Sequence, residues 1–157
     1  MREIVGKPAG GGLRVAIVVA RFNRAVTESL LDGALEGLRE HGVADDAIDV
    51  LRVPGAFEIT VAAEQCAASG RYAALICLGA VVRGETPHFE FISREVSRGV
   101  NDVACRHRIP VAFGVLTTDN VEQALARAGD GHGNKGYEAA VTALEMAALL
   151  RDHARLS

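Results

Sequence analysis

Residues 79–88, Gly-Ala-Val-Val-Arg-Gly-Glu-Thr-Pro-His, hold the residue types best suited to chemistry. The segment ends an apolar run and turns on Gly84, after which Thr86 is the predicted N-cap and Pro87 the first position of a helix. Backbone N–H groups at the start of a helix lack partners within the helix and therefore suit an anion. With His88 beside it, the turn predicts a phosphate site with an acid/base group, or else a plain strand–helix connection.

Apolar periodicity indicates the elements that position this segment, with strands and helices alternating along the chain. Strands that are apolar on both faces and alternate with helices are typical of a parallel sheet covered on both sides. The predicted fold is a three-layer α/β/α, flavodoxin-like domain with a four-stranded parallel sheet over residues 13–157, preceded by a tail over residues 1–12. Strands are predicted over residues 13–19, 48–53, 72–82 and 111–116. Helices are predicted over 26–38, 58–69, 87–109, from Thr118 or Asp119 to Arg127, and over 137–151.

Ligands of such sheets bind beyond the carboxyl ends of the strands. Those ends are followed by residues 20–23, 54–58, 83–88 and 117–120. Aromatic, carboxylate and histidine side chains and the predicted anion-binding turn are therefore expected to meet at one edge of the sheet.

Composition narrows the class of protein. The chain has 157 residues, 49% of them hydrophobic and 24% charged, as expected of one globular domain. A net charge of −3 without a basic block argues against a nucleic-acid partner.

The three cysteines, Cys66, Cys77 and Cys105, form no C-x-x-C pair and are interpreted as reduced thiols without a metal or disulfide role. The longest apolar run, residues 73–82, is too short to span a membrane, and residues 1–12 lack the apolar core of a signal peptide, so we expect a soluble cytoplasmic protein.

Six blocks of the sequence together resemble the 6,7-dimethyl-8-ribityllumazine synthase family, and the resemblance extends from about residue 13 to about residue 150. One departure is Thr60, where the family often has proline. The resemblance implies the penultimate step of riboflavin biosynthesis, carried out without a cofactor. In that step 5-amino-6-(D-ribitylamino)uracil condenses with 3,4-dihydroxy-2-butanone 4-phosphate, releasing phosphate and water. The blocks are residues 21–23, 54–59, 79–88, 113–118, 123–129 and 133–136.

The resemblance also implies which residues hold the pyrimidine and its ribityl chain. Phe22 is expected to stack on the pyrimidine, and Glu58 to accept hydrogen bonds from ribityl hydroxyls. Each residue also has a purely structural alternative: packing at a strand end for Phe22, and favourable interaction with a helix dipole for Glu58. The other expected contacts are Ala56, Phe57, Val81, Val82, Phe113 and Lys135, of which Phe113 and Lys135 are expected to reach the site of an adjacent subunit.

Phosphate binding and proton transfer are assigned in the same way. Gly84, Glu85 and Thr86 are expected to bind phosphate, with Glu85 contributing only its backbone because its charge would repel an anion. Arg127 would complete the phosphate site, there or in the adjacent subunit, although a cation near a helix end is also ordinary. His88 is the expected proton carrier.

The family resemblance further implies a homo-oligomer. Family members form pentamers, and in some members twelve pentamers enclose a hollow shell. The compact glycine-rich loop over residues 129–136 favours the shell, with a free pentamer or a decamer as alternatives. The tail is expected to add a strand to the sheet of a neighbouring subunit. Riboflavin synthase is a candidate partner inside such a shell.

Three functions are alternatives to the lumazine synthase reaction. An archaeal-type riboflavin synthase would dismutate lumazine, but the set of phosphate-binding residues favours a phosphorylated substrate. A lumazine- or flavin-binding shell protein without catalysis is less favoured because both His88 and Arg127 are present. A flavodoxin-like electron carrier is disfavoured because no Ser/Thr-rich loop follows the first strand.

Overall fold

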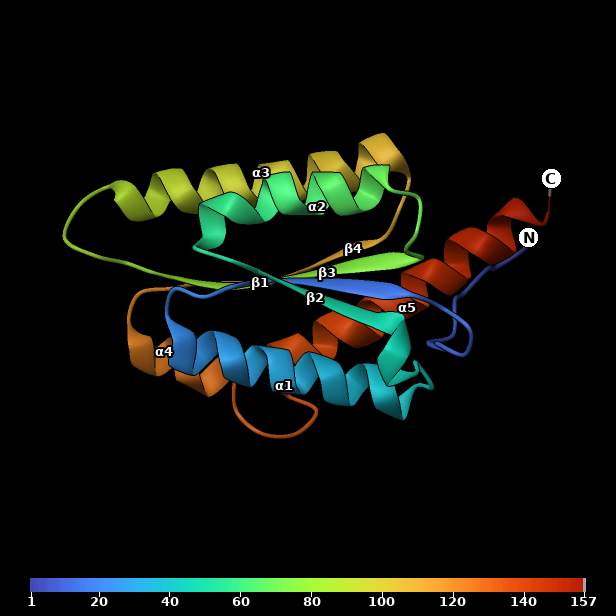
Figure 1. The fold of residues 1–157 in the computed structure, drawn as a ribbon, viewed down its shortest axis with the longest axis horizontal. Coiled ribbons are helices and arrows are strands. Elements are labelled where there is room, and N and C mark those ends of the chain that lie inside the picture. The colour runs from blue at the N-terminus through green and yellow to red at the C-terminus, as the bar shows by residue number, and fades with distance from the viewer. Residues whose placement is uncertain (157) are drawn as a thin grey trace.

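Four parallel strands in the order β2-β1-β3-β4 form the centre of the molecule in a computed structural model, which describes residues 1–156. Helices α2 and α3 cover one face of the sheet, and α1, α4 and α5 cover the other (Figure 1). This arrangement confirms the predicted three-layer architecture; residue 157, the end of the predicted domain, lies outside the described residues. The elements are β1 Val15–Ala20, α1 Arg24–Glu40, the 3-10 turn η1 Asp45–Ala47, β2 Ile48–Val53, the 3-10 turn η2 Ala56–Glu58, α2 Ile59–Ala68, β3 Ala74–Val82, α3 His88–His107, β4 Val111–Thr118, α4 Val121–Arg127 and α5 Lys135–Ala154.

The central strands β1 and β3 are apolar because both of their faces are covered. All six residues of β1 are buried, and Ile17 and Val18 belong to the cores on opposite faces of the sheet. Burial raises the pKa of the Cys77 thiol, in the middle of β3, to about 12. In the edge strand β2, by contrast, Asp49 and Arg52 are partly exposed or exposed, as expected for a strand with one neighbour.

Helices α1 and α5 pack closely because glycines and one buried asparagine lie between them. A methyl group on Gly136 would collide with the main-chain carbonyl of Leu30. The Asn134 side chain caps α5, accepting hydrogen bonds from the amides of Gly136 at 2.7 Å and Tyr137 at 3.2 Å. The same side chain donates to the carbonyl of Ser29 at 3.0 Å. Asn134 thereby ties the loop before α5 to α1.

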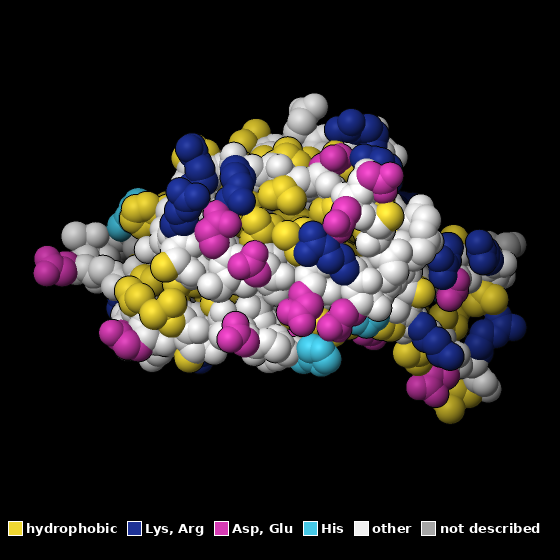
Figure 2. Space-filling model, turned by 60° about the horizontal axis from the view of Figure 1, so that its bottom comes forward, with side chains coloured by type: hydrophobic (Ala, Val, Ile, Leu, Met, Phe, Trp, Pro, Cys, Tyr) yellow, Lys and Arg dark blue, Asp and Glu magenta, His cyan; other side chains and the backbone are white. Residues whose placement is uncertain are grey.

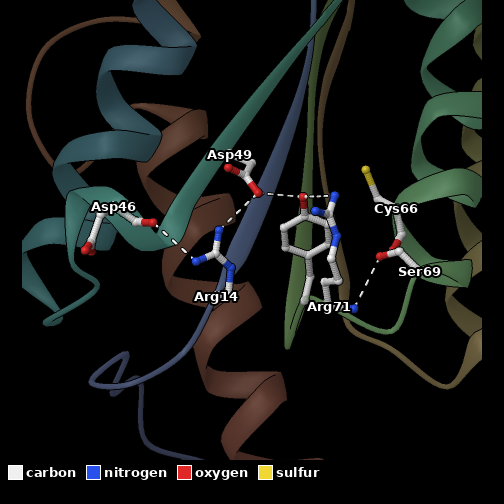
Figure 3. A network of polar contacts seen from close by, with 7 residues as sticks. Arg14, Asp46, Asp49, Cys66, Ser69 and Arg71 are labelled. Carbon is white, nitrogen blue, oxygen red and sulfur yellow. Dashed lines mark hydrogen bonds and ion pairs between the residues drawn. The ribbon is translucent and has the colours of Figure 1, made fainter.

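A polar network joins the amino ends of three strands (Figure 3). Asp49 of β2 accepts hydrogen bonds from the Tyr72 hydroxyl at 2.6 Å and from Arg14 Nη2 at 3.3 Å. Arg71 donates to the Tyr72 hydroxyl at 3.1 Å. The hydrogen bond from Tyr72 holds the pKa of the Asp49 carboxyl below its usual value. Because Arg14 precedes β1 and Tyr72 precedes β3, the network fixes the strand ends opposite the predicted site.

The N-terminal tail lies against the molecule's own helices. Residues 1–10 form neither helix nor strand. Gly6 is buried where a methyl group would collide with the main-chain carbonyl of Glu145 in α5, and the Gly10 amide donates to the carbonyl of His41 at 2.7 Å. The start of the chain and the end of α5 lie on the same side of the molecule (Figure 1). The addition of a strand to a neighbouring subunit stays a prediction.

Charges of both signs are mixed over the side of the molecule that carries α1 and α4. Figure 2 shows Lys and Arg interspersed with Asp and Glu on the face turned forward, with apolar side chains between them. Exposed ion pairs such as Arg39–Asp45 at 2.7 Å and Lys135–Glu138 at 2.7 Å contribute little to stability because water screens them. Across residues 1–156, no helix combines the length and apolar character needed to traverse a bilayer.

Candidate active site

The carboxyl end of β1 presents Phe22 to solvent. The ladder between β1 and β2 continues past the strands, since the amide of Arg21 donates to Val53 O at 2.8 Å and that of Phe22 to Pro54 O at 3.1 Å. These bonds fix the backbone while the Phe22 side chain remains 71% exposed. An aromatic face held in this way is available for stacking.

Asn23 follows in the left-handed conformation, with φ 60° and ψ 50°. Asparagine tolerates this region better than most residues with a Cβ atom. Its side-chain amide donates to the carbonyl of Ala80 at 2.8 Å and so joins the end of β1 to β3. The sequence interpretation assigned Asn23 no role, although its place in the Arg-Phe-Asn block was a signal.

The end of β2 leads into the 3-10 turn η2. Ala56 is buried, whereas Phe57 is 61% exposed and Glu58 is exposed. A methyl group on Gly55 would lie 3.2 Å from Glu58 Oε2, so the carboxylate folds over Gly55. The turn thus presents an aromatic ring and a carboxylate side by side.

The end of β3 leads into a loop whose amides are unpaired. Within the described chain, the N–H groups of Gly84, Glu85 and Thr86 form no hydrogen bond to protein atoms. The loop ends at the N-terminus of α3, a helix of 20 residues whose dipole also favours an anion. Four N–H groups at or near a helix start are suited to phosphate, and His88 supplies both the fourth amide and an imidazole.

The predicted start of this helix was wrong by one residue. Thr86 makes no capping hydrogen bond, and Pro87 occupies the N-cap position with φ −69° and ψ 4°. The Pro87 carbonyl accepts the amide of Glu90 at 3.0 Å, so His88 is the first helical residue. The imidazole therefore lies at the very start of α3, directly after the free amides.

These strand ends surround one cleft of about 570 Å³. Nine of the thirteen residues proposed from the sequence line it, together with Asn23 and Phe89. Glu85 lies in the loop beside the cleft but does not line it. The nine are Phe22, Ala56, Phe57, Glu58, Val81, Val82, Gly84, Thr86 and His88.

The remaining three residues lie in a second cleft. Phe113, Arg127 and Lys135 line a hollow of about 340 Å³ beside β4, and it shares no lining residue with the first cleft. Because β4 pairs only with β3, this hollow follows an open edge of the sheet. The fold of one chain therefore does not bring these three residues to His88.

Helix α4 presents Arg127 to this second cleft. Its predicted N-cap, Thr118 or Asp119, was wrong: Asn120 is the N-cap, and its side chain accepts the amide of Gln123 at 2.9 Å. Arg127 Nη1 donates to the carbonyl of Gln123 at 3.0 Å, and among the described residues the guanidinium has no carboxylate partner. Its charge is therefore free to meet an anion.

Three of the other four histidines have structural contacts outside both clefts. His132 stacks on Tyr137, with ring centroids 4.4 Å apart, and His41 Nδ1 lies 2.7 Å from the carbonyl of Gly37. His107 Nε2 lies 2.8 Å from Glu64 Oε1 and thereby joins α3 to α2. These contacts give the three side chains structural roles.

A comparison with protein families identifies the chain. The model of the family described as 6,7-dimethyl-8-ribityllumazine synthase matches residues 12–151, which include every element of the sheet and both clefts. This family belongs to riboflavin biosynthesis. The protein is a member of the 6,7-dimethyl-8-ribityllumazine synthase family.

Proposed function

We propose that this protein condenses 5-amino-6-(D-ribitylamino)uracil with 3,4-dihydroxy-2-butanone 4-phosphate, giving 6,7-dimethyl-8-ribityllumazine, phosphate and water. The main support is that nine predicted site residues share one cleft with a run of unpaired amides. Family membership supports the same reaction. The proposed steps are additions, eliminations and proton transfers, which protein side chains can assist without a cofactor.

The pyrimidine and its ribityl chain would occupy the part of the cleft near β1 and β2. Phe22 and Phe57 are largely exposed, and a flat heteroaromatic ring against Phe22 would cover apolar surface. The Glu58 carboxylate can accept hydrogen bonds from ribityl hydroxyls close to Ala56. The backbone of Val81 and Val82 would meet the polar edge of the pyrimidine.

The phosphate group would bind where the loop after β3 meets α3. The amides of Gly84, Glu85 and Thr86 and the hydroxyl of Thr86 can all donate to phosphate oxygens. Glu85 would contribute only its backbone, because its carboxylate would repel the ligand. This site would hold the butanone phosphate with its leaving group at the start of α3.

His88 would move protons between the reacting atoms. The uracil amine adds to the ketone carbonyl, and loss of water gives an imine. Removal of a proton from the neighbouring carbon, which bears the hydroxyl, expels phosphate and leaves an enol. The enol takes up a proton at the terminal carbon and becomes a carbonyl. Attack of the ribityl-bearing nitrogen on this carbonyl closes the ring with loss of a second water. An imidazole beside the phosphate can accept the proton in the elimination step and return it during ring closure.

A second copy of the chain would complete the site. Phe113, Lys135 and Arg127 lie at the open edge of β4, and a neighbouring subunit could bring them to the first cleft. Arg127 would then add its positive charge to the phosphate. We therefore propose a homo-oligomer of pentamers, located in the cytoplasm. Riboflavin synthase is a candidate partner. Residues 13–157 would form the catalytic domain, and residues 1–12 a tail outside it.

The compact loop ahead of α5 favours twelve pentamers in a shell over a free pentamer or a decamer. Asn134 ties the end of that loop to α1 through the carbonyl of Ser29. Light scattering on the purified protein measures the particle mass. A mass of 60 subunits would support the shell, and a pentamer mass would contradict it.

The test of the reaction follows lumazine absorbance after both substrates are mixed with the protein. Product formed faster than the uncatalysed background, with saturation in each substrate, would support the synthase. No acceleration would contradict it. Conversion of lumazine alone into riboflavin would instead identify a riboflavin synthase.

A further inference from the structure

Arg83 lies between β3 and the loop proposed to bind phosphate, and no role was assigned to it from the sequence. Its amide donates to the carbonyl of Thr118 at 2.8 Å, which continues the β3–β4 ladder one residue beyond β3. The next residue, Gly84, begins the run of unpaired amides. Arg83 is thus the last residue of this segment that the sheet holds.

The Arg83 side chain contacts three groups from two separate elements. Nε donates to Asp119 Oδ1 at 2.9 Å, in the turn between β4 and α4. Nη1 lies 3.5 Å from Glu90 Oε1, and the guanidinium carbon lies 4.5 Å from the centroid of the Phe89 ring; both partners are in the first turn of α3. The guanidinium therefore connects the start of α3 to the end of β4.

Asp119 is itself fixed by a reciprocal cap. Its amide donates to Gln123 Oε1 at 2.9 Å, while the Gln123 amide donates to Asn120 Oδ1 at 2.9 Å. Asp119 and Asn120, which form this turn, are therefore both hydrogen-bonded to Gln123 of α4. On this side, Arg83 is attached to a rigid part of the fold.

On its other side, Arg83 meets residues of the cleft. Phe89 lines the cleft and follows His88 directly in the first turn of α3. Among the described residues, the amides of residues 84–86 donate to no protein atom, so the backbone hydrogen bonds that hold the loop lie at its two ends. Arg83 is one end, and the first turn of α3 is the other. A guanidinium that donates a hydrogen bond to Asp119, pairs with Glu90 and lies over the Phe89 ring can fix both ends together.

We propose that Arg83 is a positioning residue, which holds the first turn of α3 against the β4–α4 turn so that His88 and the amides of residues 84–86 keep their geometry. Direct binding of phosphate is disfavoured because two carboxylates, those of Asp119 and Glu90, already compensate its charge. This inference rests on the proposed function of the same cleft.

A double-mutant cycle tests the role, with Arg83→Met, Asp119→Ala and the double variant compared to the unmodified protein. Methionine keeps an unbranched side chain over Phe89 but removes the hydrogen bond to Asp119 and the ion pair with Glu90. We expect each single variant to lower kcat about tenfold through misplacement of reacting groups. We expect the double variant to be no slower than Arg83→Met alone, because both changes remove one connection.

Two results would overturn the proposal. One is an unchanged kcat and KM in Arg83→Met. The other is an Arg83→Met loss as large in the Asp119→Ala background as in the unmodified protein, because Arg83 would then act independently of the β4–α4 turn. Arg106→Met is the matched control: Arg106 pairs with Glu64 at 2.7 Å near the far end of α3, and its loss should leave kcat unchanged.

Folding and function are separated by two further measurements. Arg83→Lys keeps a positive charge near Asp119 and should recover part of the lost rate, even if Arg83→Met assembles poorly. Titration of each protein with inorganic phosphate, followed by calorimetry, needs no turnover, and the cycle should be non-additive in phosphate affinity as well. If the effects of the two substitutions on phosphate affinity were non-additive but the protein made no lumazine, the proposed function would be contradicted and the role of Arg83 supported. If their effects on phosphate affinity were additive, the role of Arg83 would be contradicted.

Discussion

The side-chain amide of Asn23 donates a hydrogen bond of 2.8 Å to the main-chain carbonyl of Ala80, joining the carboxyl ends of β1 and β3 at the floor of the cleft. Asn23 also has a positive φ of 60°, which lets the chain turn directly from Phe22 into α1. One residue thus fixes two strand ends and the exposed aromatic ring before it.

Substitution of Asn23 separates these two contributions. Asn23→Gly should lose only the hydrogen bond to Ala80, lowering the free energy of unfolding by about 1 kcal/mol. Asn23→Ala should lose as much and also strain the left-handed backbone, adding about 1 kcal/mol. Denaturant unfolding of both variants measures the difference, and an alanine variant more stable than the glycine variant would contradict this account.

His88→Ala should slow lumazine formation by about tenfold to a hundredfold without abolishing it. Activity remains because binding and orientation of the two substrates supply much of the acceleration. Steady-state kinetics over a range of pH measures the loss. His153→Ala, which changes an exposed histidine near the end of α5, is the control, and a His88→Ala protein with an unchanged pH–rate profile would remove His88 from its role.

Arg127→Ala should mainly raise KM for the butanone phosphate, by about tenfold or more, because a charge-assisted contact to the anion is lost. The KM for the pyrimidine should change little. Arg151→Ala, at an exposed position on α5, serves as the control. An Arg127→Ala protein with unchanged KM for the phosphorylated substrate would show that this cation lies outside the phosphate site.

Tyr72→Phe should make stability less dependent on acid. The Tyr72 hydroxyl holds the pKa of the Asp49 carboxyl below its ordinary value in the folded chain. The bond therefore stabilises the fold fully above the ordinary pKa of an aspartate and less as pH falls through the lower pKa of the folded state. Urea unfolding at neutral pH should show a loss of about 1 kcal/mol that shrinks in acid. A loss of equal size at both pH values would refute the link to Asp49.

The sequence by itself determined the order of the elements and the family. A short continuous apolar run such as residues 15–20 is typical of a strand covered on both faces, and helical spacing such as that of Val96, Val100 and Val103 indicates one buried face. The same reasoning placed Phe22, Glu58 and His88 after parallel strands, whose carboxyl ends meet at one edge. The local pattern was sufficient to predict these elements because the buried positions of a helix or strand recur at a fixed spacing and are occupied by apolar residues.

Only the tertiary structure decided how these pieces meet. Helix starts at His88 and after Asn120 depend on which carbonyl and side chain form the first hydrogen bonds, and several neighbouring residues had suitable chemistry. The links from Asn23 to Ala80 and from Arg83 to Asp119 join residues 57 and 36 positions apart. The order of strands put Phe113 at an open edge, away from His88. Spacing along a chain does not record which strand lies at the edge of a sheet, because that choice is made by packing between distant segments.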